Sequence, residues 1–256
     1  MIRKILGLSL LCVFSFNANA QATDDNEINI DQQGDTLTLY IDQYGYGNKI
    51  GLDNFASGSS AMPITGTTLT FNIDQIGNEN LLFGKFVGDS STANLLWTGD
   101  SNVWDWNVGY VGSADTSTYD VDITGDSNTM DFDQGYNASA ERLDLDLTVI
   151  GDSNIFDIDI DVDDAVWNMD ITGGSNNINT LQKDGGEHEI NLVLNGSSAD
   201  IDINQISGTC GQGISTCNGI ITLDVDSENA TIQINQKDSA NDLSLIHISE
   251  PTRQSP

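Results

Sequence analysis

A short polar turn that recurs along the chain restricts the fold more than any other feature. It reads GDSN at 99, 125 and 151, with the related forms YGYGN at 44, GNEN at 77, GGSN at 173, GSSA at 196 and SENA at 227. From the turn at 77 onwards, the intervals range from 22 residues (77 to 99) to 31 residues (196 to 227). Such recurrence indicates a repeat protein built from copies of one small unit. The predicted turn glycines are Gly45, Gly47, Gly77, Gly99, Gly125, Gly151, Gly173 and Gly196.

The residues on both sides of each turn alternate between apolar and polar with the period of a β-strand. Val121 and Ile123 precede the turn at 125, and Met130 and Phe132 follow it, with aspartate common at the positions between. This alternation predicts strands with one buried and one wet face. A single strand-turn-strand unit cannot bury its apolar face, but stacked units can. The sequence therefore predicts an all-β protein, a parallel β-solenoid of about eight copies with two strands per coil. The four tryptophans, Trp97, Trp104, Trp106 and Trp167, occupy predicted inward positions.

Amide side chains occupy repeated positions beside the turns and at the ends of the apolar rows. In register, they could hydrogen-bond to the same residue one coil above and below, as asparagine and glutamine ladders do in cross-β stacks. The alternative is that Gln43 and Gln75 lie at strand ends and contact water. The predicted ladder positions are Gln43, Asn48, Gln75, Asn80, Gln134, Gln182, Gln205 and Gln236.

The termini do not belong to the repeat. Residues 1–20 combine a basic start, an apolar run and a small-x-small ending at Ala18 and Ala20, which predicts a secretory signal peptide cleaved after Ala20. No later segment is long and apolar enough to predict a membrane span. Residues 243–256 ignore the repeat and begin LSLIHISEPTR, which looks like a translated sequencing adaptor, so we expect a non-native tail there. The solenoid domain is expected to occupy residues 21–242.

The chain is strongly acidic, with a formal net charge of −31 from 39 acidic and 8 basic residues. Such a surface repels nucleic acid and anionic membranes and attracts cations. Two interpretations stay open: the aspartate rows bind Ca²⁺ through carboxylate oxygens, or they keep an exported protein soluble. No other cofactor is expected. The weak candidates for a metal site are Asp157, Asp159, Asp161 and Asp163.

Two longer segments, at residues 55–67 and 208–219, interrupt the regular spacing of the repeat, and both are expected to project as loops. Pro63 supports the first assignment because proline cannot sit in a central strand. The second contains Cys210 and Cys217, which in an exported protein most simply form a disulfide. Free thiols are the alternative, and a metal site is third because no histidine accompanies the cysteines.

One copy of the repeat reads Gln43-x-Gly45-x-Gly47-Asn48-x-Ile50-x-x-x-Asn54, with a looser copy at Gln75-x-Gly77-x-x-Asn80. This pattern resembles the repeat of curlin, the subunit of the curli fibres of Gram-negative bacteria, and Gln134 and Gln182 match the closing glutamine of that family's repeat. It departs at Leu37, where curlin has serine, and in the middle copies, where apolar residues replace the first glutamine. The resemblance implies secretion through the outer membrane, amyloid-type fibres in a biofilm matrix, and a nucleator subunit and an export pore as partners.

The expected function is thus that of a secreted structural subunit that self-associates by strand addition. The main alternative is a monomeric adhesin that uses the solenoid as a stalk with cation-binding acidic faces. A polysaccharide-acting β-helix enzyme is a third reading. The chain is not expected to be an enzyme: it has two histidines, His188 and His247, and carboxylates so frequent that their spacing assigns no acid and base roles.

Overall fold

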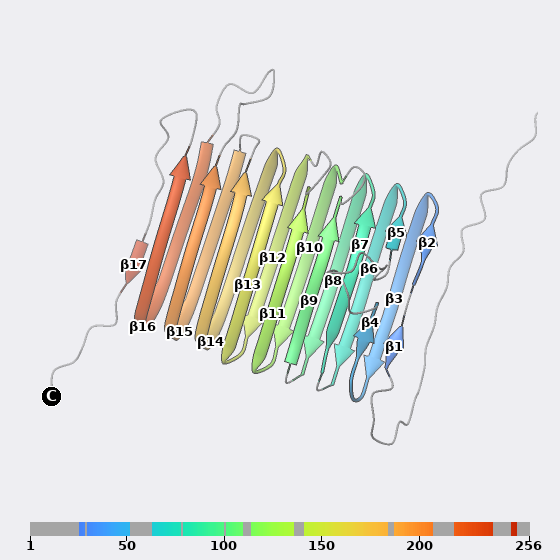
Figure 1. Cartoon of the computed structure of the whole chain (residues 1–256), viewed down its shortest axis with the longest axis horizontal. Coiled ribbons are helices and arrows are strands. Elements are labelled where there is room, and N and C mark those ends of the chain that lie inside the picture. The colour runs from blue at the N-terminus through green and yellow to red at the C-terminus, as the bar shows by residue number, and fades with distance from the viewer. Residues whose placement is uncertain are drawn as a thin grey trace, which may run out of the picture.

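The computed structural model describes residues 26–28, 30–51, 63–77, 79–99, 101–109, 114–135, 141–183, 187–206, 218–237 and 247–249. Every regular element in these ranges is a β-strand, and all of the pairings between strands are parallel. Each coil consists of a strand before the turn, here called the first arm, and a strand after it, here called the second arm. The strands lie side by side along the long axis of the molecule (Figure 1).

The first arms form one continuous ladder of neighbours, in which each strand pairs with the corresponding strand of the next coil. In order, the strands are β3 (Thr36–Tyr44), β6 (Thr68–Ile76), β8 (Ser90–Thr98), β10 (Thr116–Thr124), β12 (Arg142–Ile150) and the first parts of β14 (Asp164–Lys183), β15 (Glu187–Ile206) and β16 (Asn218–Lys237).

The second arms form a matching ladder that begins half a coil earlier. In order, the strands are β1 (Glu27–Ile28) with β2 (Gln32–Gln33), β4 (Lys49–Ile50) with β5 (Pro63–Thr65), β7 (Leu81–Val87), β9 (Ser101–Val108), β11 (Ser127–Gln134), β13 (Ser153–Asp161) and the last parts of β14, β15 and β16. The parallel β-solenoid with two strands per coil is confirmed. The stack differs slightly from the prediction because β1 and β2 add a half-coil before the first predicted turn.

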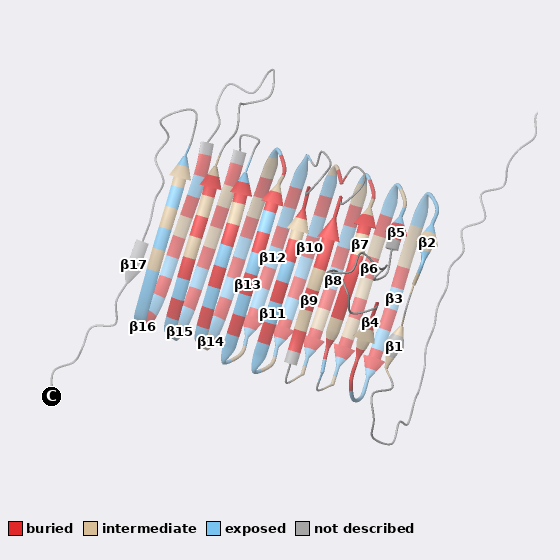
Figure 2. Cartoon of the chain, in the orientation of Figure 1, coloured by how far each residue is buried: buried red, intermediate tan, exposed pale blue. Residues whose placement is uncertain are grey.

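The core lies between the two ladders. Side chains alternate between buried and exposed along most strands, as the bands in Figure 2 show, with β7 an exception in which three consecutive residues are buried. Aromatic side chains from opposite arms meet there: the ring centroids of Phe71 and Phe86 are 4.8 Å apart, and those of Trp97 and Trp104 are 5.7 Å apart. All four tryptophans are buried, as predicted. The period-two pattern therefore identified the inward face correctly.

The last three coils differ from the rest in the continuity of their strands. β14, β15 and β16 each run for 20 residues through the turn without a break, whereas β10 and β11 are separate strands on either side of theirs. Residue-by-residue pairing continues through the corner, where Gly173 pairs with Gly196 and Gly196 with Ser227.

The prediction of a loop over residues 55–67, with Pro63 outside any strand, is wrong for residues 63–65. Residues 63–65 form β5, which pairs with β2 on one side and β7 on the other. Proline is tolerated because it is the first residue of the strand. On the β2 side, pairing begins one residue later, between Gln32 and Ile64. Likewise, β16 begins at Asn218, within the second predicted loop.

None of the described residues forms a helix long and apolar enough to cross a membrane.

Candidate functional site

Buried asparagines at the fourth turn position form the longest side-chain ladder. The Nδ2 atom of each donates a hydrogen bond to the Oδ1 atom of the asparagine in the next coil, at 2.9 Å for the first pair and 2.7 Å for the other three. From Asn102 onwards, each also donates to the carbonyl oxygen of the glycine in its own turn. The ladder therefore ties each corner to itself and to its neighbour. Its members are Asn80, Asn102, Asn128, Asn154 and Asn176.

The glycines of the turns stack directly on one another beside this ladder. A Cβ atom built on Gly151 would lie 1.7 Å from the carbonyl oxygen of Gly125, and one on Gly173 would lie 1.7 Å from that of Gly151. The same close approach recurs at Gly77, Gly99 and Gly125. Glycine is required at these corners because a backbone atom of the preceding coil occupies the space of the side chain.

A second ladder joins the first coils. The Nε2 atom of Gln75 donates to the Oε1 atom of Gln43 at 2.7 Å, and the indole nitrogen of Trp97 donates to the Oε1 atom of Gln75. Both glutamines are buried. The Nε2 atom of Gln43 also donates to the carbonyl oxygens of Asn26 and Lys49. Here the structure favours the ladder over contact with water.

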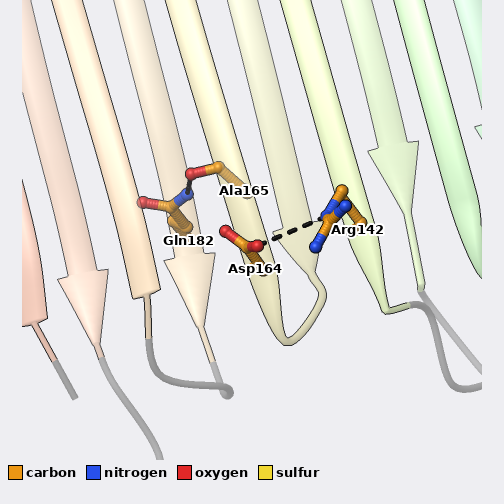
Figure 3. Close-up of polar contacts among 4 residues, drawn as sticks. All are labelled: Arg142, Asp164, Ala165 and Gln182. Atoms are coloured by element: carbon orange, nitrogen blue, oxygen red, sulfur yellow. Dashed lines mark hydrogen bonds and ion pairs between the residues drawn. The ribbon is translucent and has the colours of Figure 1, made fainter. Parts of the chain in front are cut away.

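A third ladder joins the last coils at the far end of the second arm. The Nε2 atom of Gln205 donates to the Oε1 atom of Gln182 at 2.9 Å, and that of Gln236 donates to the Oε1 atom of Gln205 at 2.8 Å. Figure 3 shows the start of this ladder, where Gln182 donates to the carbonyl oxygen of Ala165 at 3.3 Å. In the same view, the guanidinium of Arg142 lies 3.4 Å from the carboxylate of Asp164 in the next coil.

Two of the predicted ladder residues stand outside these ladders. Gln134 pairs in register with Val108 on one side and Ile160 on the other, so it donates instead to the hydroxyl of Ser117 at 3.2 Å. The Nδ2 atom of Asn48 donates to the carbonyl oxygen of Gln43, and its Oδ1 atom is buried without a hydrogen bond. Gln134 lacks a matching amide in the neighbouring coils, whereas Asn48 lies in the same column as Asn80 and still forms no hydrogen bond with it. Position in the repeat is therefore insufficient for membership, because the two amides must also meet in hydrogen-bonding geometry.

Together the three ladders cross every step of the stack from β3 to β16. Gln43 to Gln75 joins the first two coils, the asparagines join the coils from β7 to β14, and the last glutamines join β14, β15 and β16. A slip of one residue would turn these amides outward and leave their partners buried without bonds, at a cost of about 1 to 3 kcal/mol each. The ladders therefore specify the register between coils.

The outer face of the second arm carries in-register carboxylates. Asp131 pairs with Asp157, and Asp133 pairs with Asp159. Burial and the charges of Asp131, Asp159 and Asp157 raise the pKa of Asp133 to about 6. Burial and the same kind of repulsion raise the pKa of Asp131 and of Asp159. Asparagine interrupts the carboxylate rows at two places and so reduces the repulsion between neighbouring charges. The side chain of Asn107 donates to Asp133, and that of Asn179 donates to Asp157.

The four weak candidates for a metal site do not converge. Asp157, Asp159 and Asp161 project outward at alternate positions of β13, about 6.7 Å apart along the strand. Asp163 follows the strand, and Asp161 lies 3.1 Å from the ammonium of Lys183. In the described part of the chain, no group of three or more His, Cys, Asp or Glu side chains could hold a metal ion.

The two ends of the stack present similar inward side chains. At the first end, Ile28 and Ile30 are partly buried against the core, and Gln32 is half-buried. At the last end, Ile232 and Ile234 are partly buried and Gln236 is half-buried. One coil inside, Ile201 and Ile203 are fully buried. Within the described ranges, the second arm of each end coil pairs with a neighbouring coil on one side only, which accounts for this partial exposure.

The predicted non-native tail contributes a strand. β17 (His247–Ser249) pairs in parallel with Asp224 to Asp226 of β16. The open edge of β16 therefore accepts a strand that does not belong to the repeat. The other proposed features of the termini and loops, including the signal peptide and the Cys210–Cys217 disulfide, lie outside the described residues.

Four members of the longest ladder are not among the ladder positions predicted from the sequence: Asn102, Asn128, Asn154 and Asn176. The signal was present, because asparagine is the fourth residue of each of these turns. The curlin-like pattern, by contrast, points to the glutamines.

Comparison with known proteins identified no relative: no family model, no curated protein and no solved structure matches this chain.

Proposed function

We propose that this protein is a secreted structural subunit, similar to curlin, that assembles into amyloid-type fibres by adding one solenoid to the end of another. Its role would be in a biofilm matrix or in cell adhesion on the outside of a Gram-negative bacterium. The support comes from the second-arm edges at the two ends, at β1 and β2 and at the last part of β16, which pair with no further strand among the described residues, and from the side chains that those edges present. Parallel edges with unpaired backbone groups are templates for strand addition.

The observation that carries the proposal is the match between the two ends. The register through the second arms places Gln236 in the same column as Gln32, and Ile232 in the same column as Ile28. The inward triad Ile28, Ile30 and Gln32 of one copy therefore corresponds to the triad Ile232, Ile234 and Gln236 of another. Two copies stacked head to tail would continue the columns without a change of residue.

The polarity of the glutamine ladder fits this stacking. Each hydrogen bond between two amide side chains of adjacent coils is here called a rung. In each glutamine rung of the last coils, the Nε2 atom of the later coil donates to the Oε1 atom of the earlier coil. Gln32 of an added copy would donate to Gln236 in the same sense. The junction would also bury four partly exposed isoleucines. Full burial of such a side chain contributes about 1.5 to 3 kcal/mol relative to full exposure.

Complementary end variants test the proposal. Ile30→Asp places a charge at the first end, and Ile234→Asp places one at the last end. Since both residues lie at an open end, we expect each variant to fold. Asn235→Asp is the matched control, because Asn235 points outward on the same strand.

We expect the parent chain and Asn235→Asp to form dye-binding fibres, and each end variant alone to remain monomeric. Mixing the two end variants should give heterodimers without fibres, because only one intact junction can form. Heterodimers would be detected by size-exclusion chromatography with light scattering. Fibres formed by either end variant alone would show that growth uses another surface. A parent chain that stays monomeric and binds no amyloid dye would favour the adhesin instead.

A further inference from the structure

A regular array of hydroxyl side chains covers part of the outer face of the first arms, over β3, β6, β8 and β10. One column consists of Thr36, Thr68, Ser90 and Thr116. The other, two residues further along each strand, consists of Thr38, Thr70, Thr92 and Thr118. All eight side chains are exposed or half-buried. The array ends at β12, where Arg142 and Asp144 replace the hydroxyls.

The backbone determines the spacing of the array in both directions. Neighbouring coils lie about 4.8 Å apart, and outward residues of one strand recur about every 6.7 Å. The strands pair one to one over nine residues at each of the three steps, so no bulge disturbs the columns. Figure 1 shows these strands lying nearly parallel, with little change of direction along the stack. Four coils therefore present a two-dimensional lattice of hydroxyl and methyl groups.

The array is uncharged in a chain with a formal net charge of −31. None of its eight residues is ionisable, and the next outward column consists of Tyr40, Asn72 and Asn94 before it reaches a carboxylate at Asp120 in the fourth coil. A neutral surface is complementary to a neutral partner and poorly suited to a cation or a basic protein. It also lacks, within its two columns, the aromatic side chains that typically line binding sites for organic ligands.

We propose that this hydroxyl array binds ice. Its two spacings are close to repeat distances between water oxygens on the surfaces of hexagonal ice. The threonine hydroxyls can hydrogen-bond to surface waters, and the methyl groups between them hold those waters in a regular arrangement. Loss of side-chain freedom is small, because threonine is stiff at χ1. The activity is separate from fibre growth, which uses the ends of the stack.

The test is thermal hysteresis, the gap between the melting and freezing temperatures of a single ice crystal in a solution of the full chain. We expect a gap that grows with protein concentration, together with faceted crystals. Thr92→Tyr, in the middle of the array, should abolish most of the gap. Thr148→Tyr is the matched control, because Thr148 is exposed on the same ladder but lies outside the array; it should leave the gap unchanged.

Thr118→Tyr provides a second variant if thermal melting shows that Thr92→Tyr does not fold. No gap in the parent chain, or an equal loss in the array variant and the Thr148→Tyr control, would overturn the proposal. So would binding of the array to a crystalline polysaccharide without any effect on ice.

Discussion

The middle of the stack and its last coils hold neighbours in register with different side chains. In the coils from β7 to β14, the buried rungs are asparagines at the turn, beside a column of closely stacked glycines. In β15 and β16, alanine replaces asparagine at positions 199 and 230, and serine replaces glycine at 227. The rungs there are glutamines at the far end of the second arm.

The transition takes place within β14. This strand carries both Asn176, the last residue of the asparagine ladder, and Gln182, the first of the glutamine ladder. The asparagine column can therefore change to alanine in β15 and β16, because the glutamine column supplies the hydrogen bond between coils there. The comparison teaches that one buried amide rung for each coil step is maintained, while its place in the coil varies.

The largest effect is expected for a Cβ atom in the glycine column. Gly173→Ala would place a methyl group 1.7 Å from the backbone of Gly151, whereas Gly174→Ala meets its nearest atom at 3.3 Å. Because backbone atoms cannot yield without parting the coils, we expect Gly173→Ala to lower the free energy of unfolding by about 3 kcal/mol or more. Gly174→Ala should cost much less. Chemical denaturation measures both, and equal costs would contradict the stacking of the corners.

Removal of a middle rung should have the next largest effect. Asn128→Ala deletes the partner of both Asn102 and Asn154, so about 1 to 3 kcal/mol should be lost. Asn48→Ala is the control, since Asn48 makes no rung to the next asparagine in the described structure and its Oδ1 atom is already unbonded. A similar loss in the control would mean that the ladder adds nothing beyond local packing.

The outer faces of the two regions should differ in their response to pH. In the middle, Asp131, Asp133, Asp157 and Asp159 lie together, whereas the last coil carries Gln233 and Asn235 in the same columns. The pKa of Asp133 is raised to about 6, so its charged form destabilises the fold above that pH. Stability is gained as the pH falls from about 6 towards the ordinary value near 4.

Asp133→Asn should therefore stabilise the protein at pH 7, by about 1 kcal/mol after screening by solvent, and have little effect at pH 4. The asparagine can still accept the hydrogen bond from Asn107 through its Oδ1 atom. Thermal melting at the two pH values gives the comparison. An equal effect at both values would show that neither the burial of the Asp133 carboxylate nor its repulsion by neighbouring carboxylates acts on stability.

The smallest effect is a gain. Ala199→Asn would extend the asparagine ladder into β15, where residue 199 already pairs in register with Asn176. One additional buried hydrogen bond contributes about 0.5 to 1.5 kcal/mol. We expect a small rise in the denaturation midpoint, with Ala230→Asn alone giving no rise because residue 199 would still interrupt the column. A loss of stability in Ala199→Asn would indicate that the last coils have no room for this rung.

Much of the architecture was accessible from the repeat. The period-two alternation identified the inward residues, and the recurring turn located the corners, because both signals are local and depend on strand geometry alone. The start of β5 at Pro63 was missed because tolerance of a proline depends on which neighbouring backbone groups need a donor. The sequence gives no direct sign that pairing with β2 starts one residue later.

The ladders, too, were predicted from the sequence only in part. Repetition predicted that inward amides could meet, but Gln134 and Asn48 occupy the correct positions and make no rung. Whether two amides bond depends on the residue in the next coil and on the distance between the two side chains. Gln134 lies between Val108 and Ile160, so its position alone was misleading.

The sequence by itself determined the unit, its inward face and the need to stack, because a strand-turn-strand copy with one apolar face has no other way to bury it. Only the tertiary structure decided which amides form rungs, where one ladder replaces another, and that the two ends present matching triads. These properties arise between residues of different coils, whose contacts depend on the three-dimensional register of the whole stack.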